Sequence, residues 1–145
     1  FELGLGLLFL SWSLGLLSLG QVVLITAGLT LGIYDFRHQE YPLLVWMTFH
    51  LLLMACSGWN LVMAVFLILG IMAHFIDIRM GAGDFLFLSS CALVFSATEL
   101  LILIQFASAM GILAFLLQKK KERLPFVPFL LLAACVIIFG KLLLV

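Results

Sequence analysis

Charged side chains are scarce in this chain. Asp, Glu, Lys and Arg make up 10% of its 145 residues, whereas 66% are hydrophobic and the mean hydropathy is +1.37. A soluble domain covers its core with polar residues, and too few are present here, so an ordinary soluble domain is excluded. The net charge is zero, so no basic excess favours nucleic acid, and we expect no nucleic-acid partner.

Closely spaced cysteines are absent as well. The chain has three cysteines, none of them in a CxxC pair, and all lie within apolar runs: Cys56, Cys91 and Cys135. A zinc site needs closely spaced ligands, so we predict no metal site and no other cofactor. We interpret the three cysteines as packing residues.

The chain does contain a series of apolar runs separated by short polar segments. The runs are continuous rather than alternating, which favours membrane helices over the strands of a barrel. The predicted spans are 3–19, 20–35, 42–57, 60–76, 84–97, 99–117 and 125–143. We therefore expect an all-α, polytopic transmembrane bundle of about six to seven spans. Residues 1–145 would form one membrane-embedded domain.

The basic residues agree with this layout. If the spans alternate in direction, six of the seven basic residues fall on one side: Arg37, Arg79, Lys119, Lys120, Lys121 and Arg123. Basic loops are retained on the cytoplasmic side of a membrane. We therefore predict that the loops 35–42, 77–84 and 118–124 face the cytoplasm. The run 119–123 is interpreted as a topology anchor beside anionic lipids.

Two aspartates at this predicted face are candidates for chemistry, because carboxylates near membrane depth are costly and usually functional. Asp35 follows Gly28 and Gly32 at helical spacing, so the three lie on one stripe that another backbone can approach. This predicts that Asp35 faces a packed interior. A second interpretation, equally favoured by Asp35 alone, is an interfacial aspartate hydrogen-bonded to Arg37.

Asp84 ends the segment Gly81-Ala82-Gly83-Asp84 and opens an apolar run. Glycines spaced by one residue permit an unusual backbone path and leave room for an extended peptide, so Gly81 and Gly83 are candidate substrate-binding residues. For Asp84 alone, a helix N-cap is the simpler interpretation. Considered together, Asp35 and Asp84 are candidates for a pair of adjacent carboxylates. Two adjacent carboxylates share one proton, so one acts as general base and the other as general acid.

These segments resemble the motifs of the prepilin peptidases, the type IV leader peptidases among the GxGD membrane aspartyl proteases. Residues 33–42, IYDFRHQEYP, are similar to the first aspartate motif, in which an aspartate closes a helix and a proline opens the next. Residues 81–84, GAGD, match the second motif, and 125–130, PFVPFL, resemble the start of a late helix. The resemblance implies that Asp35 and Asp84 are the catalytic pair.

The resemblance also implies a function. We expect an aspartic endopeptidase that cleaves the leader from type IV pilin-like precursors at the cytoplasmic face of the bacterial plasma membrane. Its partners would be these precursors and the lipid bilayer. Family members carry an N-terminal region with two CxxC pairs, which is absent here, and the chain begins at Phe1, so we expect a fragment of a longer protein. The alternatives are a small ion- or proton-coupled transporter and an inactive membrane scaffold.

Other polar residues receive structural interpretations. Asp77 and His74 are three residues apart, so they share a helix face and are placed to hydrogen-bond each other. A catalytic or substrate role for Asp77 is the less favoured interpretation. His50 lies within a predicted span and is expected to form a hydrogen bond with a neighbouring helix.

Overall fold

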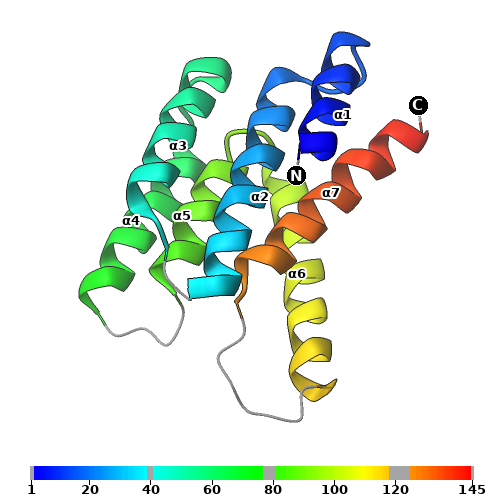
Figure 1. Cartoon of the computed structure of the whole chain (residues 1–145). Helices are drawn as coiled ribbons and strands as arrows, with labels where there is room; N and C mark the ends of the chain where they lie inside the picture. The colour runs from blue at the N-terminus through cyan, green and yellow to red at the C-terminus, as the bar shows by residue number, and fades with distance from the viewer. Residues whose placement is uncertain (1, 39–40, 77–80, 118–124, 145) are drawn as a thin grey trace.

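The chain forms seven α-helices in the part described by the computed structural model, residues 2–38, 41–76, 81–117 and 125–144 (Figure 1). The prediction of an all-α fold is confirmed. The helices are α1 (Glu2–Ser13), α2 (Leu19–His38), α3 (Leu43–Ser57), α4 (Leu61–Phe75), α5 (Ala82–Cys91), α6 (Ala97–Leu117) and α7 (Val127–Leu144).

Each predicted span overlaps one helix, but two of the helices are much shorter than their apolar runs. α1 ends at Ser13, and the chain then turns through Gly15, whose φ of 72° is in the left-handed region that favours glycine. α5 has 10 residues and begins at Ala82 rather than at Asp84. Residues 92–95 continue the apolar run without continuing the helix.

Polar residues mark the starts of α2 and α4 at the end of the bundle opposite the two aspartates. Ser18 and Gln21 hydrogen-bond each other's backbone N–H at the start of α2, which is a capping box. At the start of α4 the Asn60 side chain accepts from the Met63 N–H at 2.7 Å. Asn60 also donates to the Ala92 carbonyl at 2.7 Å, so this cap ties α4 to the end of α5.

The bundle is organised around α2 and α5. α5 packs closely against α4, whereas α2 contacts α3 on one side and α7 on the other, and α6 packs on α7 (Figure 1). α2 approaches α7 closely because it has glycine at the contact. A Cβ atom on Gly28 would lie 2.5 Å from Leu131 Cδ1 and 3.1 Å from Phe87 Cζ. Phe87 is fully buried, so this contact joins α2, α5 and α7.

In the part of the chain that the structure describes, two helices are long and apolar enough to cross a membrane, α6 and the Leu19–Arg37 part of α2. Among the described residues, α3, α4, α5 and α7 are apolar but fall short of that length, so six to seven spans are not shown. The outer surface is nevertheless apolar, with Leu44, Phe75 and Leu143 each about four-fifths exposed or more. Extensive exposed apolar surface is typical of contact with lipid or with another protein.

Candidate active site

Asp35 lies in the last turn of α2, on the stripe that its spacing from Gly28 and Gly32 predicted. Gly28 faces Leu131 of α7, and the space beside Gly32 borders Pro128. Asp35 follows on the same face, and its carboxylate faces the backbone N–H of Val127, the first residue of α7. Asp35 therefore faces another helix, as predicted, and its polar neighbour is Val127 rather than Arg37.

Asp84 lies in the first turn of α5 and is not the N-cap of that helix. The N-cap is Gly81, so the interpretation of Asp84 as an N-cap is wrong by three residues. The Asp84 side chain instead turns back toward the backbone of Gly81, as an acidic residue does at the third helical position of a capping box, and Asp84 Oδ2 lies 3.2 Å from where a Cβ atom on Gly81 would be.

The two aspartates come together at one end of the bundle. α2 reaches that end with its C-terminus and α5 with its N-terminus, and the negative charge of Asp35 acts on the Asp84 carboxyl group. The starts of α3 and α7 lie at the same end (Figure 1). Helix N-termini carry partial positive charge, so they favour carboxylates placed beside them.

The glycines of the GAGD segment provide space rather than an unusual backbone. Gly81 has φ −65° and ψ 132°, an extended conformation that any residue adopts, and Gly83 is helical. A Cβ atom on Gly83 would lie 2.5 Å from Tyr41 Cδ2 and 2.6 Å from Tyr41 Cγ. The room predicted for a peptide beside Gly83 is therefore occupied by the Tyr41 ring.

Tyr41 is a residue of this site that sequence reasoning did not single out. It lies between α2 and α3, directly before Pro42, and the Tyr41 hydroxyl group is buried. Burial raises the pKa of Tyr41 far above its usual value, and the nearby charges of Cys91, Asp84 and Asp35 raise it further. The only sequence signal for Tyr41 was its place inside the first aspartate motif.

A second polar cluster lies deeper between α3 and α5. Trp46 Nε1 donates to the Leu86 carbonyl at 2.9 Å and to Ser90 Oγ at 3.0 Å. His50 stacks on Trp46, and its Nδ1 is 2.9 Å from Ser90 Oγ. The prediction that His50 bonds to a neighbouring helix is confirmed. The interaction expected of His74 with Asp77 cannot be placed, because Asp77 lies outside the described residues.

A groove of about 410 Å³ lies between α3, α4 and the start of α5, and is lined mainly by apolar side chains. Ala82 and Leu86 form its α5 wall. They are four residues apart and share one face of α5, whereas Asp84 is two residues from each and points to the opposite face. The groove is therefore separated from the aspartate pair by the width of α5.

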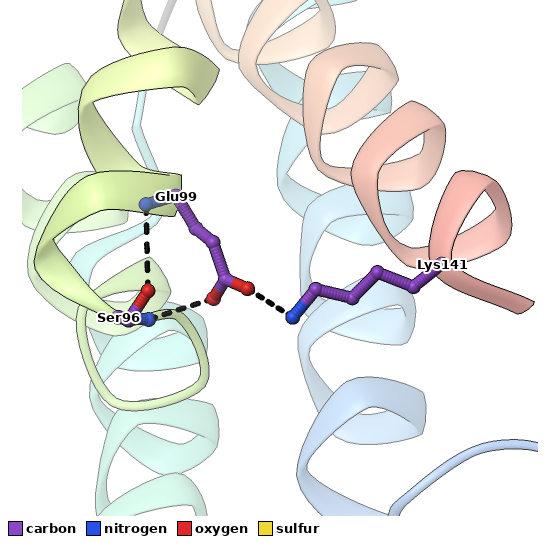
Figure 2. Close-up of polar contacts among 3 residues, drawn as sticks. All are labelled: Ser96, Glu99 and Lys141. Atoms are coloured by element: carbon purple, nitrogen blue, oxygen red, sulfur yellow. Dashed lines mark hydrogen bonds and ion pairs between the residues drawn. The ribbon is translucent and has the colours of Figure 1, made fainter. Parts of the chain in front are cut away.

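The remaining described carboxylate with polar partners is Glu99, at the far end of the bundle. Glu99 accepts from the Ser96 N–H at 2.9 Å and donates its own N–H to Ser96 Oγ at 3.4 Å. Glu99 also forms an ion pair with Lys141 (Figure 2). These contacts cap α6 and tie it to α7. They give Glu99 a structural role.

Within the described residues, no group of three or more His, Cys, Asp or Glu side chains is arranged to hold a metal ion. Comparison with known proteins gives no match: no family model, no curated protein and no solved structure is significantly similar to this chain. Its function is therefore inferred from its motifs and from the geometry of the site.

Proposed function

We propose that this chain is a membrane-embedded aspartic endopeptidase, with Asp35 and Asp84 as its catalytic pair. The observation that carries the proposal is the convergence of these two carboxylates, from separate helices, at one end of the bundle. The resemblance to the prepilin peptidases adds the substrate class, the leader segments of type IV pilin-like precursors.

The pair supports hydrolysis without a metal. Two nearby carboxylates hold one proton between them, because ionising both places like charges side by side. The ionised aspartate takes a proton from the attacking water, and the protonated one polarises the scissile carbonyl and then protonates the leaving amine. In this scheme one aspartate acts as the base and the other as the acid.

The setting we propose is the bacterial plasma membrane, crossed several times. α2 and α6 are long enough to cross a bilayer alone, and the shorter apolar helices complete the bundle around them. Such short helices fit a locally thinned bilayer or one bordering a water-filled space. The aspartate pair would lie at the cytoplasmic face, where Arg37 follows Asp35 and the remaining basic residues of that side are predicted.

The test is cleavage of a pilin-type precursor by the chain in vesicles of bacterial phospholipid. Wild type should release the leader, and Asp35→Asn and Asp84→Asn should each reduce the rate by about 10²–10⁴-fold, as expected for loss of general acid–base catalysis. The matched control is Glu99→Gln, which neutralises a carboxylate at the opposite end and should cleave at nearly the wild-type rate.

The outcomes separate the alternatives. A folded wild type that cleaves no precursor but carries ions across the vesicle membrane would make it a transporter. A folded wild type with neither property would make it a scaffold. Substantial cleavage by either asparagine variant would remove that aspartate from the pair.

A further inference from the structure

Two buried polar atoms at the aspartate end have no hydrogen-bond partner within the described part of the chain. They are the Tyr41 hydroxyl oxygen and Oδ2 of Asp35. A buried polar group left unpaired costs free energy comparable to a lost hydrogen bond. The two groups are complementary, because a phenol O–H donates and a carboxylate oxygen accepts.

The Tyr41 ring is fixed beside the pair by its neighbours. Its Cβ, Cγ and Cδ2 atoms occupy the space that a Cβ atom on Gly83 would need, one residue before Asp84. Pro42 follows, and a residue before proline is restricted to extended backbone conformations. Tyr41 is thus held against α5 by packing on one side and by a restricted backbone on the other.

The charged and titratable groups around the Tyr41 phenol are acidic. They are Asp35 on α2, with Asp84 and Cys91 on α5. Negative surroundings oppose loss of the phenol proton, so the pKa of Tyr41 is raised, first by burial and then by these charges. Tyr41 therefore stays protonated wherever the pair is active, and it remains a hydrogen-bond donor.

We propose that Tyr41 is a positioning residue of the aspartate pair, whose hydroxyl group donates a hydrogen bond to the ionised carboxylate when substrate closes the site. This inference rests on the proposed peptidase function and deepens it. The donated bond holds the base in one orientation and favours its ionised form, so that the other aspartate keeps the shared proton. Gly83 serves the same arrangement by leaving room for the ring.

The decisive variant is Tyr41→Phe, because it keeps the ring against Gly83 and removes only the hydroxyl group. We expect kcat to fall by about 10- to 100-fold with KM unchanged, the size of effect that a hydrogen bond to a charged group has. Without this bond the ionised base is less favoured, so its pKa rises and the acidic limb of the rate profile moves to higher pH. The control is Tyr34→Phe, which removes the chain's other phenol hydroxyl, from an exposed residue next to Asp35.

A second measurement does not depend on activity. In protein labelled with ¹³Cζ-tyrosine, the Tyr41 signal is assigned by its absence from Tyr41→Phe. Neutralising either carboxylate, in Asp35→Asn or Asp84→Asn, should shift the ¹³Cζ resonance of the protonated Tyr41 phenol at neutral pH, because a negative neighbour is removed. The Tyr34→Phe variant should leave this resonance in place.

The results distinguish this inference from the proposed function. If folded wild type cleaves no precursor, the peptidase function fails, and the positioning role fails with it. If wild type cleaves and Tyr41→Phe matches its kcat and pH profile, the positioning role alone is overturned. It is also overturned if Tyr41→Phe loses rate with an unchanged pH profile, which indicates a structural role. An identical Tyr41 ¹³Cζ resonance in wild type and Asp35→Asn would overturn it as well.

Discussion

The Asp35 carboxylate faces the backbone N–H of Val127, where the end of α2 lies beside the start of α7. The same two helices meet one and two turns earlier along α2, at Gly32 and Gly28. The position of Asp35 therefore depends on how closely α2 and α7 approach. Any substitution that separates these helices should move the Asp35 carboxylate away from Val127 and relative to Asp84.

Gly28 and Gly32 provide a matched test of this dependence. Gly28→Ala places a methyl group 2.5 Å from Leu131 Cδ1 and 3.1 Å from Phe87 Cζ, and both neighbours are buried. We expect it to destabilise the bundle by about 1–3 kcal/mol, as overpacking does, and to slow cleavage. Gly32→Ala meets only Pro128, at 3.9 Å, so it should be tolerated.

Unfolding of both variants in detergent, followed by circular dichroism, measures the difference. Alanine favours a helix over glycine by about 0.5–1 kcal/mol, so Gly32→Ala serves as the control for that gain. Equal stability and equal activity of the two variants would show that close approach at Gly28 does not position Asp35.

The stripe of Gly28, Gly32 and Asp35 was predictable because helical spacing alone fixes which residues share a face. The length of α5 could not be predicted from the sequence. Residues 92–95 are as apolar as the helix before them, and Leu93 and Phe95 are buried in the turn that follows. Since helix and turn are both buried here, hydropathy gives no sign of where the helix ends. The start of α6 did carry a signal, the capping-box spacing of Ser96 and Glu99.

Ser90 should matter more than its neighbour Ser89, although both are buried. Ser90 Oγ accepts from Trp46 and bonds to His50, whereas Ser89 donates only to the Leu86 carbonyl of its own helix. Ser90→Ala leaves His50 Nδ1 unpaired and removes one of the two acceptors of Trp46. We expect a loss of about 1–3 kcal/mol in the free energy of unfolding.

The matched control, Ser89→Ala, should cost less than about 1 kcal/mol, because the hydrogen bond it removes lies within α5 rather than between helices. Thermal unfolding in detergent compares the two. The fluorescence of Trp46, with Trp12 and Trp59 replaced by phenylalanine, should change in the Ser90 variant only. An equal loss of stability in both variants would contradict the assignment of Ser90 as the link between α3 and α5.

The contacts of Glu99 predict a stability effect without an effect on cleavage. Ser96→Ala removes the hydroxyl that accepts the Glu99 N–H, and loss of an N-cap typically costs about 0.5–2 kcal/mol. Lys141→Met should cost less than about 1 kcal/mol, because the Lys141 side chain is 56% exposed and surface ion pairs contribute little. Both variants should cleave at the wild-type rate, and a large loss of activity in either would place Glu99 in the chemistry.

The candidate site was predictable in its residue types but not in its geometry. Asp35 and Asp84 stood out because carboxylates are rare in this apolar chain and lie at predicted helix ends. Val127 contributes a backbone N–H, which no side-chain pattern reveals. Tyr41 fills the space beside Gly83 through a contact between segments far apart in the sequence, and such contacts depend on packing rather than on local spacing.

The proposed pair predicts a rate profile that falls at both low and high pH. At low pH both carboxylates are protonated, so no base remains to activate water. At high pH both are ionised, so no acid remains to protonate the leaving amine. Between these limits the pair holds one proton and is active, and its two apparent pKa values belong to the pair rather than to either residue. Measuring kcat/KM for the precursor from pH 4 to about 10, with circular dichroism to show that the bundle stays folded, tests this. A rate that rises with pH to a plateau would indicate a single base, and the shared proton would have to be abandoned.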